Sequence, residues 1–249
     1  MIVDKKIYYK DDALEVSRTH YEKHHSNMPM HCHDYLTISL LLTGTLIEQV
    51  SDNSHTGQAG YLTIKPANLF HSDFFTEDCS FLSLKIYDWE YYGFDFRDWL
   101  WLSESLTLKH FLDIVRSKNM KKSLDQFKSF LTDRIVLSKK EYAPVWLLNA
   151  HQLIIENLQE NLNISDIAKK VGRHPVHLSR TFMQFYGMDL KAYHRHLYFH
   201  YGISNSLNVP KKLTEIAYNG GFSDQSHFCR TFKKIMSMTP GNALALLDV

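Results

Sequence analysis

The chain has 249 residues, of which 44% are hydrophobic, and carries 28 Lys+Arg against 27 Asp+Glu. This composition excludes a disulfide-stapled miniprotein and a wholly disordered chain, and it allows one large domain or two of about 100–150 residues. The sequence has no apolar run long enough to span a bilayer, no signal peptide and only three scattered cysteines. We therefore expect a cytoplasmic protein without a membrane partner or a disulfide framework.

The balanced total charge hides a difference between the two halves. Residues 144–249 hold 11 Lys+Arg against 7 Asp+Glu, whereas residues 1–143 hold 17 against 20. The second half is therefore net positive and the first half net negative. A basic half favours an anionic partner such as a nucleic acid.

The first 90 residues show the pattern of short strands separated by turns. Residues 37–40, 61–64 and 81–87 alternate polar and apolar side chains, and turn-prone residues cluster at 43–44 and 51–54. Short strands at this spacing predict a β-barrel or a β-sandwich.

From about Arg97 the apolar residues recur at helical intervals. The pattern predicts two amphipathic helices, over residues 97–115 and 124–136. Two interpretations stay open: both helices pack on the barrel, or one of them forms a dimer seam. We expect a homodimer assembled through this half of the chain.

A second helical block begins at Pro144 and continues to the C-terminus, with residues 139–143 as the linker. We therefore predict two domains, residues 1–143 and residues 144–249, in an α+β chain. The second domain is expected to be all-α.

The second block contains an internal repeat. The hexapeptide pattern His–apolar–x–Arg–Thr–Phe occurs at residues 177–182 and again at 227–232, which are 50 residues apart. Upstream, Ile167-Ala168 mirrors Ile216-Ala217, and Gly172 mirrors Gly221. Because the two sequence repeats are so similar, we predict that each folds into the same supersecondary unit.

Each copy has the signals of a helix, a tight turn and a second helix. In the first copy Asn163 is a good N-cap, Gly172 supplies a turn and Pro175 stands where a helix tolerates proline. This arrangement is a helix-turn-helix, whose second helix enters the major groove of DNA.

The helical period sorts the second helices into faces. Leu178 and Phe182 in the first copy, and Phe228 and Phe232 in the second, form apolar stripes. The candidate DNA-binding residues lie off these stripes, and they are Val176, Ser179, Arg180, Gln225, Ser226, His227, Arg230, Lys233 and Lys234. Arginine and glutamine pair well with base edges, whereas the two lysines suit phosphates. The alternative is that the two arginines only cap or salt-bridge the helical bundle.

The residues from Gly221 to Lys234, followed by Thr239-Pro240, resemble the second motif of the AraC family of bacterial transcription regulators. The resemblance covers about residues 150–241 and implies seven helices with two recognition helices in successive major grooves. The sequence departs from the family pattern at Gly202, which predicts a short or bent connecting helix. It also departs at His174, at Lys212 and after Pro240, where an expected phosphate contact is missing.

The histidines of the first half are spaced as in a cupin. His31 and His33, followed by Thr37, are similar to the first cupin motif, and His71 is similar to part of the second. The resemblance implies a cupin-like barrel flanked by the two predicted helices, joined to a double helix-turn-helix. Thr37 stands where cupins usually have a metal-binding glutamate.

Three imidazoles suit Zn, Fe, Ni or Cu, but without that carboxylate we expect no metal and no cofactor. We expect instead that a small polar effector, such as a sugar, forms hydrogen bonds with residues inside the barrel. The candidate effector-binding residues are His31, His33, Tyr35, Thr37 and His71. Histidines at a barrel rim with no ligand are the alternative.

The sequence thus predicts a transcription regulator that binds promoter DNA sequence-specifically and responds to an effector in its N-terminal barrel. An activator of this kind would also contact RNA polymerase. The rival hypotheses are a cupin metalloenzyme with a helical appendage and a dimeric DNA-binding protein that needs no ligand. No catalytic triad, P-loop or dinucleotide fingerprint is visible, so we expect no enzyme and assign no catalytic residue.

Overall fold

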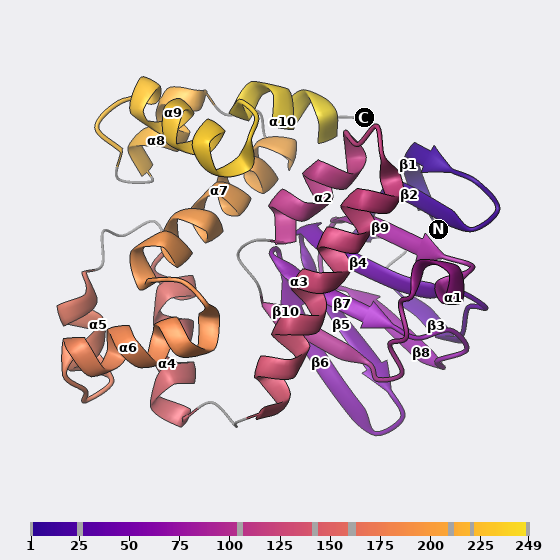
Figure 1. The fold of residues 1–249 in the computed structure, drawn as a ribbon, viewed down its shortest axis with the longest axis horizontal. Coiled ribbons are helices and arrows are strands. Elements are labelled where there is room, and N and C mark those ends of the chain that lie inside the picture. Colours follow the sequence, from indigo (N-terminus) through magenta and orange to yellow (C-terminus); the bar gives the residue numbers. More distant parts are fainter. Residues whose placement is uncertain are drawn as a thin grey trace.

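The computed structural model describes residues 2–23, 27–103, 107–140, 144–158, 163–208, 212–219 and 222–247. Strands come first in the chain and helices follow (Figure 1). None of the described helices has the length and apolar character that crossing a membrane requires.

Six antiparallel strands form the larger sheet, in the spatial order β1-β2-β9-β4-β7-β10. Their bounds are β1 Ile2–Lys10, β2 Leu14–Tyr21, β9 Cys79–Ile86, β4 Leu36–Thr43, β7 Tyr61–Lys65 and β10 Leu100–Ser103. A four-stranded sheet has the order β3-β8-β5-β6. Its strands are β3 Asn27–His31, β8 His71–Phe75, β5 Thr45–Val50 and β6 Asn53–Gln58.

The described strands thus form two separate sheets, so the predicted barrel is an open sandwich rather than a closed cylinder. Residues of both sheets meet in a small core between them, which includes Leu41, Leu46 and Phe75. The prediction of an α+β chain, with strands and flanking helices in its first part and helices alone in its second part, is confirmed for the described residues.

The larger sheet has an apolar face and a polar face. On β4, Ile38 and Leu40 are completely buried and point to the helical side, where they join a large core built with the helices. Thr37 and Ser39, which alternate with these two residues, point toward the other sheet. Because successive residues of a strand alternate between faces, this pattern leaves a polar lining between the two sheets.

Three helices come after β9, and β10 lies between the first two of them. They are α1 Trp89–Tyr92, α2 Thr107–Val115 and α3 Met120–Lys140. The prediction of one helix over 97–115 is wrong at its beginning, because residues 100–103 pair with β7 as strand β10. Leu100 and Trp101 are half-buried there, and Leu102 is buried. Such a short apolar run fits a strand at a sheet edge as well as it fits a helix.

The apolar stripes of α2 and α3 are buried within the same chain. Phe111, Phe127 and Leu131 are completely buried in the core that also contains the larger sheet. The interpretation that these helices pack on the sandwich is therefore confirmed. Homodimer formation stays a prediction, and the described apolar faces of these two helices do not provide its seam.

Seven helices make up the described part of the second block. They are α4 Val145–Glu156, α5 Ile164–Lys170, α6 Pro175–Tyr186, α7 Leu190–Asn208, α8 Leu213–Asn219, α9 Gln225–Met236 and α10 Pro240–Leu247. Residues 141–143, which include the predicted domain boundary and part of the linker, lie outside the described residues. The boundary stays a prediction.

Helix α7 continues through Gly202 over 19 residues, so the prediction of a short connecting helix is wrong. A Cβ on Gly202 would lie 2.8 Å from Cγ2 of Ile216 on α8. The glycine is therefore required for the close approach of two helices, and this gain outweighs its poor helix propensity.

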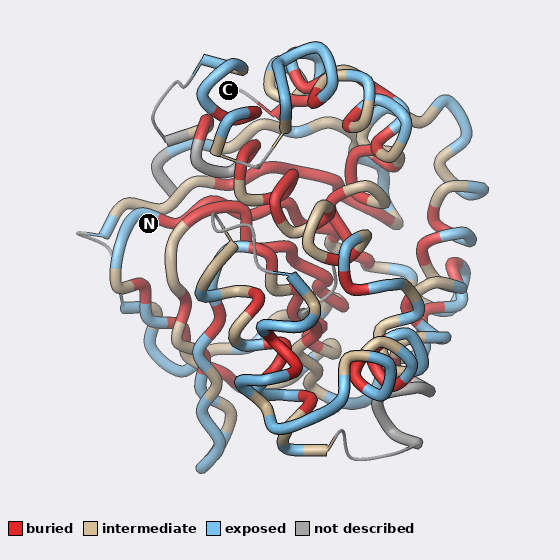
Figure 2. The backbone as a smooth tube through the Cα atoms, turned by 90° about the vertical axis from the view of Figure 1, so that its left-hand side faces the viewer, coloured by how far each residue is buried: buried red, intermediate tan, exposed pale blue. Residues whose placement is uncertain are grey.

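The two helix-turn-helix units differ in how they attach to the rest of the chain. Helices α4, α5 and α6 share a core of their own, which includes Leu147, Ile167 and Phe182. The residues of α8, α9 and α10 instead belong to the large core of the larger sheet, which includes Phe228 and Phe232. Buried residues gather in the interior of the molecule, and exposed residues lie toward its outside (Figure 2).

Candidate effector pocket and nucleic-acid interface

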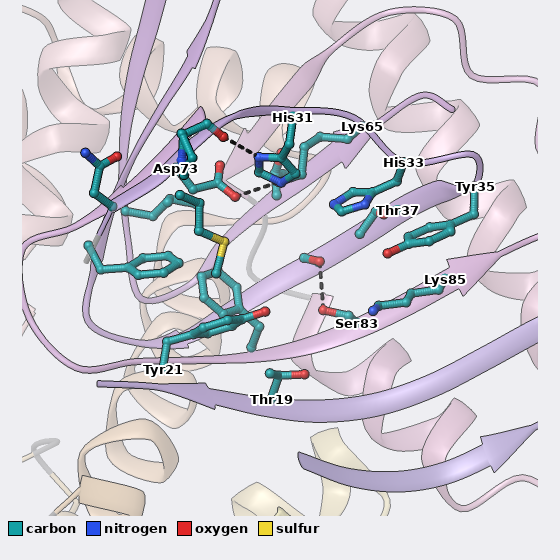
Figure 3. A pocket seen from close by; sticks show the side chains of 18 residues that line it. Thr19, Tyr21, His31, His33, Tyr35, Thr37, Lys65, Asp73, Ser83 and Lys85 are labelled. Carbon is teal, nitrogen blue, oxygen red and sulfur yellow. Dashed lines mark hydrogen bonds and ion pairs between the residues drawn. The ribbon is translucent and has the colours of Figure 1, made fainter. Parts of the chain in front are cut away.

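A cavity of about 590 Å³ lies between the two sheets, and Figure 3 shows the side chains that line it. Its wall contains residues of both sheets and of the loop between β3 and β4. The lining residues are Thr19, Tyr21, Asn27, Met28, Pro29, His31, His33, Tyr35, Thr37, Ser39, Leu46, Thr63, Lys65, Asp73, Phe75, Phe81, Ser83 and Lys85. A volume of this size suits a small organic molecule.

Four of the five predicted effector-binding residues line this cavity: His31, His33, Tyr35 and Thr37. The fifth, His71, is 1% exposed and lies directly behind them, with its ring 4.3 Å from that of His31 and 5.5 Å from that of His33. The structure therefore brings all five residues together, with His71 in the wall behind the lining.

The two ends of the cavity differ in chemistry. At one end Tyr21, Phe75 and Phe81 pack ring to ring, with centroids 5.0–6.0 Å apart. At the other end Lys85 lies with its Nζ 5.3 Å from the centre of the Tyr35 ring. This arrangement suits a ligand with one apolar part and one polar part.

Hydroxyl groups connect these two ends. The side chains of Ser39 and Ser83 form a hydrogen bond of 2.8 Å across β4 and β9, and Thr19 and Thr37 lie beside them (Figure 3). A hydroxyl both donates and accepts, so this strip suits a ligand rich in oxygen or nitrogen atoms.

A buried ion network that the sequence analysis missed crosses from one sheet to the other. The Nζ of Lys65 lies 2.7 Å from Oε1 of Glu48 and 3.4 Å from Oδ2 of Asp73. Burial alone would lower the pKa of Lys65, but the two carboxylates outweigh it and hold this pKa above its ordinary value. In the sequence these are three separate charged residues on strand-like segments. Nothing in the sequence shows that their side chains meet.

Two of the clustered histidines, His33 and His71, are neutral at pH 7. Burial, followed by the positive charge of neighbouring groups, lowers the pKa of His33 and of His71 to about 4. Neutral imidazoles can accept hydrogen bonds or bind metal ions. Ligand atoms of His31, His33 and His71 all lie within 4.8 Å of one another. Because bonds from metal to imidazole nitrogen are about 2.0–2.1 Å long, small side-chain rotations would bring these atoms onto one ion.

The first helix-turn-helix forms as its caps predict. The side chain of Asn163 accepts a hydrogen bond from the backbone of Asp166 and begins α5, and Gly172 adopts a φ of 65° in the turn. Pro175 takes the first position of α6, and Nδ1 of His174 accepts from the backbone of Val176. His174 thus does act as an N-cap, although the sequence departs from the family there.

The second helix-turn-helix follows the same plan. The carboxylate of Asp224 accepts a hydrogen bond of 2.7 Å from the backbone of His227 and begins α9. The hydroxyl of Ser223 contacts both Asp224 and Nδ1 of His227. Gly221, the predicted turn glycine, lies outside the described residues.

The candidate DNA-binding residues lie on the outer surface of α6 and α9. Val176, Arg180, Gln225, Ser226, His227, Arg230, Lys233 and Lys234 are exposed, and Ser179 is half-buried. The apolar stripes that oppose them, with Leu178 on α6 and Phe228 on α9, are at most 1% exposed. Each second helix therefore presents one polar face to solvent.

Comparison with known proteins matches residues 167–245 to the model of a family described as a helix-turn-helix domain. The C-terminal helices therefore contain a helix-turn-helix domain, which resembles the AraC type. The match includes both second helices, α6 and α9. It leaves the sandwich and its cavity outside.

Relatives of this helix-turn-helix domain occur in longer proteins. One is the HTH-type transcriptional regulator GlxA of Rhizobium meliloti, which is 31% identical over 85 residues, 34% of this chain and 26% of that protein. Another is an uncharacterised HTH-type transcriptional regulator of Staphylococcus aureus, which is 29% identical over 84 residues, 34% of this chain and 11% of that protein. The matched part spans about a quarter or less of these relatives.

Among solved structures, fatty-acid-bound ToxT of Vibrio cholerae is similar with a TM-score of 0.42 and 18% identity, over 96% of this chain and 97% of that one. A regulator of Chromobacterium violaceum with an AraC-type DNA-binding domain has a TM-score of 0.39 and 29% identity, over 40% and 89%. A cupin-2 protein of Shewanella frigidimarina has a TM-score of 0.31 and 18% identity, over 34% and 82%.

Proposed function

We propose that the chain is a DNA-binding transcription regulator whose affinity for its operator depends on a small molecule held between the two sheets. The observation that carries the proposal is that one sheet connects the two sites. Its polar face lines the cavity, and its apolar face shares a core with the second helix-turn-helix.

The AraC-type domain supports the DNA-binding part of this proposal. Arg180 and Arg230 stand at the same place in the two repeats and are exposed, so they are available for base edges. Lys233 and Lys234 lie in the last turn of α9 and are exposed, which suits contact with phosphates.

The cavity supports the ligand-dependent part. A ligand changes DNA affinity only if it binds one arrangement of the two parts more tightly than the other. Strand β2 contributes Thr19 to the cavity, and its neighbour Arg18 binds the end of α10 on the other face. A small displacement of this strand on ligand binding would therefore reach the second helix-turn-helix.

The test is selection of an operator from random duplexes with the full chain, followed by binding measurements with and without candidate ligands. Fluorescence anisotropy should show nanomolar to micromolar specific binding that a sugar or another small polar molecule shifts. His33→Ala should remove the shift while binding without ligand persists, and His55→Ala, which changes a histidine outside the cavity lining, should retain the shift. No selection of any sequence over scrambled DNA would contradict the proposal.

A further inference from the structure

The second helices of the two helix-turn-helix units, α6 and α9, end in the same way. Helix α6 ends at Gly187, whose φ is 68°, and α9 ends at Ser237, whose φ is 59°. These residues are 50 positions apart, which is the offset of the repeated hexapeptide. A serine adopts this left-handed conformation only at a cost, so a stabilising contact is expected at the end of α9.

An arginine from α3, or from the end of α2, contacts each of these helix ends. Nη1 of Arg116, the residue after α2, donates a hydrogen bond of 3.0 Å to the carbonyl oxygen of Ser237. The guanidinium of Arg134 on α3 packs so closely on Gly187 that a Cβ there would lie 2.6 Å from both of its terminal nitrogens. Because the C-terminal end of a helix carries partial negative charge, a cation is favourable at both places.

A neighbour on its own segment orients each arginine. Nη2 of Arg116 pairs with Oδ1 of Asp113 at 2.5 Å. The guanidinium carbon of Arg134 lies 5.6 Å from the centre of the Phe130 ring. A planar guanidinium that is already held loses little further freedom when it contacts a helix end.

The contact of Arg134 joins parts of the chain that have separate cores. Of the residues that the structure describes, the core of the first helix-turn-helix contains none from the sheets, from α2 or from α3. Helix α9 instead shares the large core with α2 and the larger sheet. Helix α7 runs between the two units and contributes to both cores (Figure 1). Arg134 therefore adds a second attachment of α6 to the attachment through α7.

We propose that Arg116 and Arg134 are positioning residues that fix the distance and angle between α6 and α9. The α2–α3 pair then determines which spacing of half-sites the chain accepts on DNA. Two helices that enter successive major grooves must match a helical repeat of about 10–10.5 base pairs. This inference rests on the proposed function, because half-site spacing concerns only a protein that binds DNA.

The first test measures spacing with the operator that the full chain selects. Two further duplexes contain one base pair more, or one fewer, between the bases that α6 and α9 contact. One base pair turns a half-site by about 35°, so the unchanged chain should bind both duplexes at least about tenfold more weakly. Arg134→Met and Arg116→Met should each reduce this discrimination to about threefold, which is half of it in free-energy terms.

Controls separate positioning from contact with DNA. In both methionine variants the salt slope should stay unchanged, because a positioning residue neutralises no phosphate. Arg134→Lys and Arg116→Lys keep the charge and should restore part of the discrimination. Arg97→Met removes an arginine that pairs with Asp95 at the surface and should keep the full discrimination. Circular dichroism confirms that each variant folds.

The second test uses hydrogen exchange without DNA, which reports the attachment of the helix ends directly. Arg134→Met should raise exchange in the last turn of α6 and leave α9 unchanged. Arg116→Met should do the reverse, and Arg97→Met should change neither helix.

Four results would overturn the inference. They are unchanged exchange at both helix ends in the folded methionine variants, full spacing discrimination in these variants, a reduced salt slope, and equal binding of the unchanged chain to all three spacings. If the unchanged chain selects no sequence at all, the proposed function fails. Hydrogen exchange then still decides whether the two arginines hold the helix ends.

Discussion

Arg18 of β2 donates a hydrogen bond of 2.8 Å from Nη1 to the carbonyl oxygen of Leu247, the last residue of α10. The two residues lie 229 positions apart in the chain. Tyr8 and Lys6 of β1 donate to the adjacent carbonyl of Leu246, at 3.0 and 3.4 Å. The carbonyl end of a helix carries partial negative charge and lacks partners of its own. The strands therefore cap α10, the helix that follows the second helix-turn-helix.

Arg18→Met should loosen this attachment. The change leaves the carbonyl of Leu247 without its charged donor, and we expect the free energy of unfolding to fall by about 1–3 kcal/mol. Urea denaturation measures the loss, and hydrogen exchange should show lower protection in α10. Arg97→Met is the control and should cost less than about 1 kcal/mol, since Arg97 pairs with exposed Asp95 at the surface. Unchanged protection of α10 in Arg18→Met would contradict the capping role.

The arginines and the lysines of the second helices should behave differently toward DNA. Arg180→Ala or Arg230→Ala should cost about 1–3 kcal/mol on the selected site and relax the base preference at one position. Lys233→Ala or Lys234→Ala should weaken specific and scrambled duplexes alike and reduce the salt slope by about one unit. Binding of each variant to both duplexes across a salt series measures this. If Arg230→Ala weakens binding to both duplexes equally, Arg230 contacts the DNA backbone and does not read a base.

Gly202 and Gly241 make a matched pair for testing the packing of α7. Gly202→Ala should destabilise the chain by about 1–3 kcal/mol, because the new Cβ would overlap Ile216. Gly241→Ala in α10 has nothing within 4 Å of its new Cβ and should gain up to about 1 kcal/mol from helix propensity. Thermal unfolding of the two variants should therefore shift in opposite directions. A stabilised Gly202→Ala variant would show that α7 and α8 separate at little cost.

The first helix-turn-helix should lose stability in acid through His151. Its Nε2 lies 2.7 Å from the hydroxyl of Tyr193, and burial lowers the pKa of His151 to about 4. Below about pH 6.5 the unfolded chain takes up a proton at this histidine that the folded chain does not bind until about pH 4. The free energy of unfolding therefore falls as the pH decreases across this window.

The slope from this one group is at most about 1.4 kcal/mol per pH unit. His151→Gln keeps a polar partner for Tyr193 without titrating in this range, so it should reduce the slope by up to one proton. Denaturation series between pH 7 and pH 4.5 compare the two proteins. Equal slopes would mean that His151 is protonated in the folded chain.

Features that depend on neighbours in the chain could be predicted from the sequence. The caps at Asn163 and Asp224 and the apolar stripes of α6 and α9 arise from contacts within a few residues. His31 and His33 share one short segment, whereas His71 joins them through the pairing of β3 with β8. Residues 100–103 show the limit, because pairing with β7 outweighs a local pattern that also fits a helix.

Features that join distant segments were decided by the tertiary structure alone. Asp73 meets His71 through the pleat of a single strand, but it meets Lys65 and Glu48 only because two sheets pack face to face. The last helices of the chain pack on the apolar face of the larger sheet. This packing brings the carbonyl of Leu247 within hydrogen-bond distance of Arg18. Local periodicity shows which face of an element is apolar. Which distant segment buries that face depends on how the whole chain packs, and no short stretch of the sequence contains that information.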